Sequence, residues 1–143
     1  VDEWGRREAN PNRALSAGPA GEVVLQRNRA GHFLADGEVN GRRVTFLLDT
    51  GATYIALPAQ IARELKLKLG QQITLQTAAG PATGYPTRLD SVRLAGIEMR
   101  DMAAVVAEGL DPGQVLLGMN FLRRLEMTQR GEQLILKPLA PAK

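Results

Sequence analysis

An aspartate that ends an apolar segment and opens a glycine turn constrains this chain more than any other feature. The residues are Phe46-Leu47-Leu48-Asp49-Thr50-Gly51-Ala52. A carboxylate directly after a buried strand loses hydration at a high cost in free energy, so such a residue is a candidate for function. The other interpretation is a turn that only ends the strand, because Asp and Gly are common in such turns.

The composition predicts one globular domain with a sizeable core. The chain has 143 residues, of which 44% are hydrophobic and 23% are charged, and this profile excludes disordered and collagen-like proteins. It contains no cysteine, so a disulfide framework, a thiolate zinc site and a cysteine nucleophile are excluded. The net charge of +3 is spread along the chain and aromatic residues are only 4%, which argues against a nucleic-acid surface.

The single histidine, His32, limits the available catalytic chemistry. Ser-His-Asp and Cys-His catalysis would need this residue as the base. It lies in an alternating segment that is predicted to be a strand. A solvated or hydrogen-bonded strand histidine is therefore the favoured interpretation, and a functional histidine is the alternative.

Residues 1–21 are predicted to be a flexible tether, because they are rich in Pro, Gly, Ala and Asn and show no periodicity. Val1 is not an initiator methionine, so we expect a mature or trimmed chain. Trp4 beside Arg6 and Arg7 is either an interfacial anchor next to a membrane helix further upstream or part of an ordinary linker.

Residues 22–138 are predicted to form a β-rich domain, with residues 139–143 as a short tail. The pair Asn40-Gly41 is a strong hairpin signal, and the mostly apolar strand at 44–48 is expected to be buried on both faces. Alternating or apolar segments predict strands at 23–25, 32–39, 44–48, 73–77, 83–94, around 97, at 102–106, at 115–117 and at 134–136.

An amphipathic helix is predicted after the aspartate turn. It is expected to begin at Pro58 and to end by Gly70. Its apolar face would consist of residues at helical spacing, namely Ile61, Ala62, Leu65 and Leu69.

The strands at 73–77 and 83–94 are predicted to pair as a hairpin. Its tip, Ala78-Ala79-Gly80-Pro81, is small and poor in polar side chains. It is either a surface hairpin or a lid that closes over an extended ligand.

The order of strand, glycine turn and short helix occurs twice in the chain. The first copy spans residues 47–65, and the second spans residues 116–125 and begins Leu116-Leu117-Gly118-Met119-Asn120-Phe121-Leu122. This repetition suggests a pseudo-twofold relationship within one domain.

The two motifs together resemble the retropepsins, the single-domain aspartic proteases of retroviruses and their cellular relatives. The resemblance rests on Asp49-Thr50-Gly51-Ala52 after Leu47-Leu48 and on Leu116-Leu117-Gly118 later in the chain, and it covers about residues 22–138. It is strongest to the bacterial membrane-anchored, periplasmic members, which share the helix after the turn and the Leu-Leu-Gly-Met-Asn-Phe-Leu pattern. The implied fold is mostly β: a closed β-barrel with a flap hairpin and two short helices.

The resemblance implies an aspartic endopeptidase that uses neither a cofactor nor a metal. Two carboxylates that share one proton supply the base and the acid for peptide hydrolysis by water. Because the chain has one Asp-Thr-Gly motif, the implied active site is that of a homodimer, with Asp49 of each copy meeting across a twofold axis. The alternatives are a non-catalytic module of the same fold that binds extended peptides and, third, a structural periplasmic domain.

The resemblance also implies roles for the neighbours of Asp49. Thr50 would bond across the dimer axis, and Asn120 would brace the active-site turns. The substrate-binding residues would be the turn residues Gly51, Ala52 and Thr53, the pocket residue Leu116, and the flap residues Ala78, Ala79 and Gly80.

Two departures from the viral pattern concern the groove and the chain ends. Viral members carry an acid at the position of Thr53, so substrate contacts there need not be the same. The viral chain ends interleave in a dimer sheet, whereas residues 137–141 read as a strand broken by prolines. The expected location is the bacterial periplasm, with attachment to the inner membrane through a segment upstream of this chain.

Overall fold

A computed structural model describes residues 10–12, 18, 21–77 and 79–139. The described residues form strands and two short helices, in the order β1 (Val23–Gln26), β2 (Leu34–Val39), β3 (Arg42–Leu48), β4 (Ile55–Leu57), α2 (Ala59–Glu64), β5 (Ile73–Thr77), β6 (Gly80–Leu94), β7 (Ile97–Ala107), β8 (Gln114–Leu117), α3 (Met119–Leu122), β9 (Leu125–Arg130) and β10 (Gln133–Pro138). None of these helices has the length and apolar character needed to span a bilayer.

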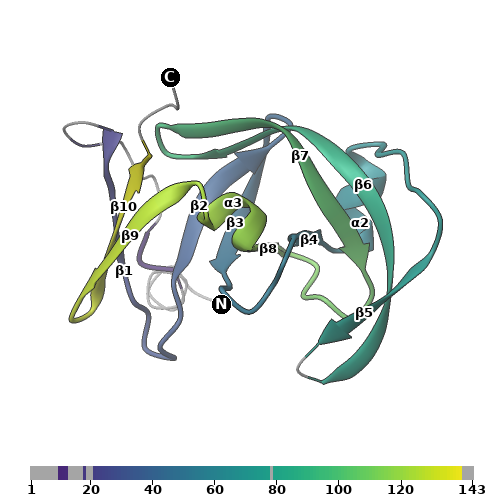
Figure 1. The fold of residues 1–143 in the computed structure, drawn as a ribbon, viewed down its shortest axis with the longest axis horizontal. Helices are drawn as coiled ribbons and strands as arrows, with labels where there is room; N and C mark the ends of the chain where they lie inside the picture. Colours follow the sequence, from purple (N-terminus) through teal and green to yellow (C-terminus); the bar gives the residue numbers. More distant parts are fainter. Residues whose placement is uncertain (1–9, 13–17, 19–20, 78, 140–143) are drawn as a thin grey trace.

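Six strands close into a barrel, which confirms the predicted fold class (Figure 1). Their order is β2-β3-β8-β4-β7-β6, and β6 returns to β2 through the pairs Glu38 with Arg93 and Val39 with Val92. Strand β5 extends the sheet beyond the barrel by pairing with β6 alone. Barrel closure leaves no free edge on these six strands.

A separate sheet has the order β1-β10-β9. Its alternating residues Val23, Leu25, Leu134 and Leu136 are buried in the common core. The strand β10 continues through Lys137 to Pro138, so it extends into the segment that the sequence suggested is broken by prolines. Within this chain, the last strand is therefore already paired on both sides.

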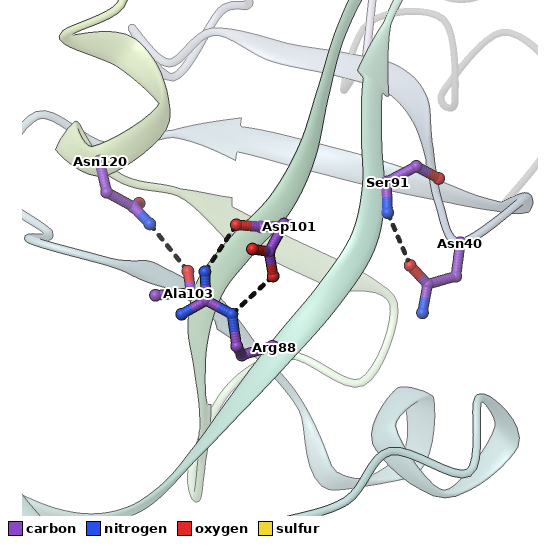
Figure 2. Close-up of polar contacts among 6 residues, drawn as sticks. All are labelled: Asn40, Arg88, Ser91, Asp101, Ala103 and Asn120. Carbon is purple, nitrogen blue, oxygen red and sulfur yellow. Dashed lines mark hydrogen bonds and ion pairs between the residues drawn. The ribbon is translucent and has the colours of Figure 1, made fainter.

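The turn between β2 and β3 forms as predicted. Asn40 and Gly41 both have positive φ, 51° and 82°, as a two-residue type I′ turn requires. The backbone N–H of Asn40 donates to the carbonyl of Ser91 at 2.9 Å, and its side-chain Oδ1 accepts from the N–H of Ser91 at 3.0 Å (Figure 2). This hairpin turn therefore also fastens β6 beside the place where the barrel closes.

The helix after Pro58 is shorter than its predicted apolar face requires. It ends at Glu64, because Lys66 has a φ of 54° and the chain reverses there. The N–H groups of Lys66 and Leu67 donate to the carbonyls of Arg63 and Ala62, both at 3.1 Å, which is a Schellman motif. The helix ends before Gly70, as predicted, but the placing of Leu69 on its apolar face is wrong, since Lys66 takes the left-handed position that glycine usually occupies.

The alternation predicted along 83–94 changes phase within β6. The buried residues Leu89 and Val92 lie three positions apart, and on β7 the buried residues Met99 and Met102 do the same. Asp101 has a φ of 54° at this point. The interruption lies between the part of β6 that pairs with β5 and the part that pairs with β2, so the long hairpin changes neighbours where its backbone is irregular.

One further prediction about local structure is wrong, and one strand was not predicted. His32 lies in an exposed loop before β2 rather than in a strand. The second helix, α3, ends at Leu122, and the chain then forms the hairpin of β9 and β10. The β9 sequence Leu-Glu-Met-Thr-Gln-Arg is mostly polar, which is why its pairing was not evident.

Part of the N-terminal segment that the sequence assigned to a tether is packed against the domain. Asn12 is only 2% exposed. Its Nδ2 donates to the carbonyls of Gln26 and Leu34 at 2.7 and 2.9 Å, and its Oδ1 accepts from the N–H of Gln26 at 2.7 Å. Asn12 therefore joins the end of β1 to the start of β2.

Candidate active site

The Asp49 turn lies where β3 ends beside β8. The two strands run parallel, with Leu47 paired with Leu116 and Leu48 with Leu117. The N–H of Asp49 donates to the carbonyl of Leu117 at 3.1 Å. Strand pairing therefore fixes the backbone up to the aspartate itself. On this strand Phe46 is fully buried while Leu47 and Leu48 are half-buried, so the expectation of burial on both faces holds only in part.

The carboxylate of Asp49 is half-buried and its orientation is fixed by the turn. Its Oδ1 accepts the N–H of Gly51 at 2.9 Å, and its backbone carbonyl accepts the N–H of Ala52 at 3.1 Å. In the part of the chain that the structure describes, this side chain forms no ion pair. One carboxylate is therefore presented without an ion-pair partner among the described residues.

The turn after β3 interlocks with the turn after β8. The N–H groups of Met119 and Asn120 donate to the carbonyls of Ala52 and Thr53 at 2.8 and 3.0 Å. At Gly118 a Cβ would lie 2.4 Å from the carbonyl oxygen of Tyr54, which is closer than any side chain can approach. Gly118 was not among the predicted site residues. Its position directly after an apolar strand was the feature of the sequence that could have indicated a close backbone approach here.

Asn120 joins three elements beside this turn. Its Oδ1 accepts the N–H of Ile55 at 3.0 Å, and its Nδ2 donates to the carbonyl of Ala103 at 2.7 Å (Figure 2). It therefore connects α3 to the start of β4 and to β7. The predicted bracing role remains a prediction, but the hydrogen bonds such a role would use are present.

The other predicted turn residues surround Asp49. Thr50 is exposed, and its hydroxyl has no hydrogen-bond partner among the described residues. Thr53 is also exposed, and Ala52 is half-buried. Leu116 is half-buried on β8, with Leu47 beside it on one neighbouring strand and Ala56 on the other.

The predicted flap is a hairpin that projects beyond the barrel (Figure 1). Thr77 pairs with Gly80 across its tip, and Thr77 Oγ1 donates to the Gly80 carbonyl at 2.6 Å. Ala79 is exposed and Gly80 has a φ of 106°. Ala78 lies outside the described residues. Almost all of β5 is exposed, so this arm has room to contact a ligand.

The sequence matches the family described as "gag-polyprotein putative aspartyl protease" over residues 35–124. This region begins in β2, contains the Asp49 turn and ends just after α3. The chain belongs to this family of aspartyl proteases.

Two curated relatives match most of this retropepsin-like chain. It is 40% identical over 111 residues to an uncharacterized protein in the cobV 5' region of Sinorhizobium sp., covering 76% of this chain and 48% of the relative. It is 36% identical over 110 residues to uncharacterized protein RP867 of Rickettsia prowazekii (strain Madrid E), covering 74% of this chain and 46% of the relative. The chain therefore spans about half the length of the curated relatives it matches.

Solved structures support the same fold. A retropepsin-like aspartic protease from Rickettsia conorii superposes with a TM-score of 0.66 at 33% identity, covering 81% of this chain and 88% of that one. EIAV protease in complex with the inhibitor HBY-793 superposes with a TM-score of 0.55 at 20% identity, covering 69% of this chain and 92% of that one. The second likeness concerns the fold alone.

Proposed function

We propose that this chain is an aspartic endopeptidase whose active site forms when two copies bring their Asp49 carboxylates together. The observation that carries the proposal is the Asp49 turn. It presents one oriented, half-buried carboxylate that forms no ion pair within the described residues. Hydrolysis by an activated water needs a base and an acid, and a single carboxylate cannot be both at the same moment.

In the proposed dimer, one Asp49 is ionised and the other is protonated. The ionised carboxylate takes a proton from a water molecule, whose oxygen attacks the peptide carbonyl, while the protonated carboxyl group donates its hydrogen to the carbonyl oxygen. The resulting tetrahedral species collapses as the C–N bond breaks. The leaving nitrogen takes the proton of the carboxyl group that accepted it from water, and the other carboxylate takes a proton from a hydroxyl of the tetrahedral species as the carbonyl forms again. The dyad then returns to its singly protonated state.

A twofold axis near Asp49 would place the same residues of both copies against each other. The exposed hydroxyl of Thr50 lacks a partner among the described residues, so it is available to bond across that axis. The interleaving of chain ends seen in the viral pattern is a less suitable contact, because β10 already lies between β1 and β9 of its own chain. We therefore place the main dimer contacts around the active-site turns.

Substrate binding in this proposal uses extended peptide geometry. Among the described strands, β5 pairs only with β6, so its other edge is available for backbone hydrogen bonds with a peptide strand. Leu116 and Ala52 are half-buried beside the turn and would form an apolar pocket. Thr53 and the flap residues Ala79 and Gly80 would border the groove.

Cleavage of a diverse peptide mixture, read by mass spectrometry, tests the proposal. The wild-type protein is expected to cut peptides, and Asp49→Asn is expected to lose at least about a thousandfold in rate. Asp111→Asn is the matched control, because Asp111 Oδ1 also accepts the N–H of the residue two positions later, at 2.9 Å from Gly113. The proposal is contradicted if wild type and Asp49→Asn cleave equally, or if wild type cleaves nothing at any acidic or neutral pH. Peptide binding without cleavage would instead favour the non-catalytic peptide-binding module.

We also propose that the full-length protein acts in the bacterial periplasm, attached to the inner membrane. This location is supported by the resemblance of the Asp49 and Leu116 motifs to periplasmic retropepsin-like proteases. A fusion of the full-length protein to alkaline phosphatase reports the side of the membrane. Phosphatase activity in intact cells is expected, and its absence in well-expressed fusions would contradict this location.

A further inference from the structure

A cavity of about 750 Å³ lies between the loop that follows α2 and the β6–β7 hairpin. Two of its lining residues come from the elements that frame the proposed active site. Tyr54 ends the segment that begins with the Asp49 turn, and Ile73 opens the flap strand β5. The cavity is therefore adjacent to the path that a bound peptide would take along the flap.

The floor of the cavity is apolar. On β7, Ala103 and Val105 line it opposite Arg88 and Pro86 of β6, and the small side chain of Ala103 leaves the space unfilled. Tyr54 and Ile73 are large, mostly apolar side chains that are 46% and 39% exposed. Exposed apolar side chains gathered around a cavity indicate a surface that binds something.

The rim of the cavity is rich in cations. Lys66 and Lys68 line it, are exposed, and have no ion pair among the described residues. Arg88 also lines it, but its guanidinium is held by Asp101 through Nε to Oδ1 and Nη2 to the backbone carbonyl, both at 2.7 Å (Figure 2). Asp90 adds one carboxylate. The two free lysines therefore outweigh the one free carboxylate.

The backbone that carries the two lysines is fixed before any ligand binds. Lys66 occupies the left-handed position of the Schellman motif. The carbonyl of Lys68 accepts the hydroxyl of Thr87 at 2.8 Å, and the N–H of Gly70 donates to the carbonyl of Pro86 at 2.7 Å. The backbone of this rim is already ordered, so it loses little conformational entropy on binding.

We propose that this cavity is a specificity pocket for the peptide substrate and selects a segment with an apolar residue beside an acidic one. The inference rests on the proposed function. The apolar side chain would fill the space over Ala103, and the acidic side chain would lie at the rim near Lys66 and Lys68. Because the cavity is outside the Asp49 turn, this segment is some residues away from the bond that is cut.

The test compares cleavage of a peptide library in which each position flanking the cut bond carries Glu, Gln, Leu or Ala. Wild type is expected to prefer Glu over Gln at one outer position by about tenfold in kcat/KM, and Lys66→Glu/Lys68→Glu is expected to lose or reverse that preference. Lys66→Arg/Lys68→Arg should keep it. Arg130→Glu/Lys137→Glu makes the same charge change on the exposed side of β9 and β10 and should also keep it.

Binding to Asp49→Asn, measured by titration with the same peptides, separates this proposal from the proposed protease activity. If wild type cleaves but the lysine reversal leaves the Glu preference unchanged in cleavage and binding, the specificity pocket is wrong and the protease stands. If wild type cleaves nothing while Asp49→Asn binds acidic peptides in a lysine-dependent way, the protease proposal is wrong and the pocket proposal stands.

A second variant, Ala103→Leu, narrows the cavity without changing its charge. It should weaken the binding of peptides that carry Leu at the position next to the acidic residue. Unchanged binding by a folded variant would also overturn the pocket proposal.

Discussion

At the scale of single residues, Gly118 lies against the backbone that follows the Asp49 turn, with no room for a side chain. Gly118→Ala would place a Cβ 2.4 Å from the carbonyl oxygen of Tyr54 and 2.9 Å from that of Ala52. Because both atoms are backbone, the turn itself has to move. We expect the free energy of unfolding to fall by about 2–3 kcal/mol and any peptidase activity to fall with it.

Chemical denaturation of Gly118→Ala measures this cost. Gly113→Ala is the matched control, because the nearest atom to a Cβ there is Asp111 Oδ1 at 3.7 Å, an ordinary contact. Equal stabilities of the two variants would show that the two turns do not interlock as described.

The ion pair of Arg88 and Asp101 predicts a pH dependence of stability. The hydrogen bond from Arg88, and then its charge, lower the pKa of Asp101 from the ordinary value of 3.8. A carboxyl group with a lower pKa in the folded state stabilises the fold above its unfolded-state pKa, and this contribution is lost as the pH falls through the folded-state pKa. Stability should therefore decrease as the pH falls below about 4.

Urea denaturation between roughly pH 5 and pH 2 checks this for wild type and Arg88→Gln. The variant should lose less stability across that range, because its Asp101 has no guanidinium to lower its pKa. Arg43→Gln, which removes an exposed arginine that has no ion pair among the described residues, should behave like wild type. If Arg88→Gln loses as much stability on acidification as wild type does, Arg88 is not what lowers the pKa of Asp101.

At the scale of elements, the Asn40 turn connects the first hairpin to the closure of the barrel. Asn40→Ala loses the bond from Ser91 N–H at 3.0 Å and puts alanine at a φ of 51°. We expect a loss of about 2–3 kcal/mol in the free energy of unfolding. Asn40→Gly accepts the positive φ and loses only the side-chain bond, so thermal or chemical unfolding should place it between wild type and Asn40→Ala. If Asn40→Gly is as unstable as Asn40→Ala, positive φ contributes nothing to the cost.

The elements that the sequence predicted correctly are those with a strong local signal. Asn40-Gly41 specifies a hairpin by its φ angles, and the apolar run to Leu48 specifies the strand that carries Asp49. The elements it missed depend on partners far along the chain. Polar β9 is a strand because β10 pairs with it. Asn12 is buried because its side chain donates to backbone carbonyls at the end of β1 and the start of β2.

The candidate site shows the same division. The Asp-Thr-Gly motif could be found from sequence because its chemistry is local to one turn. Gly118 and the cavity beside Tyr54 could not, since their roles depend on which backbone segments meet in three dimensions. Lys66 was also read as a helix residue, and its position at the cavity rim follows only from the left-handed turn.

At the scale of the whole molecule, the barrel is complete in one chain but the proposed active site is not. The six barrel strands all find their partners within one chain, whereas catalysis in the proposal needs a second copy. We therefore expect a folded monomer at low concentration and specific activity that rises with protein concentration, which sedimentation equilibrium and activity assays over the same series would measure. Constant specific activity through a measured monomer–dimer transition would contradict a shared site.

Mixing wild-type and Asp49→Asn subunits tests the shared site most directly. At a fixed total concentration high enough for dimers, and after time for subunit exchange, a site built from two Asp49 residues is active only in wild-type pairs. Total activity should then fall as the square of the wild-type fraction, so that an equal mixture retains about a quarter of the activity. Activity that falls in direct proportion to the wild-type fraction, with one half remaining in an equal mixture, would show that each chain carries a complete site of its own.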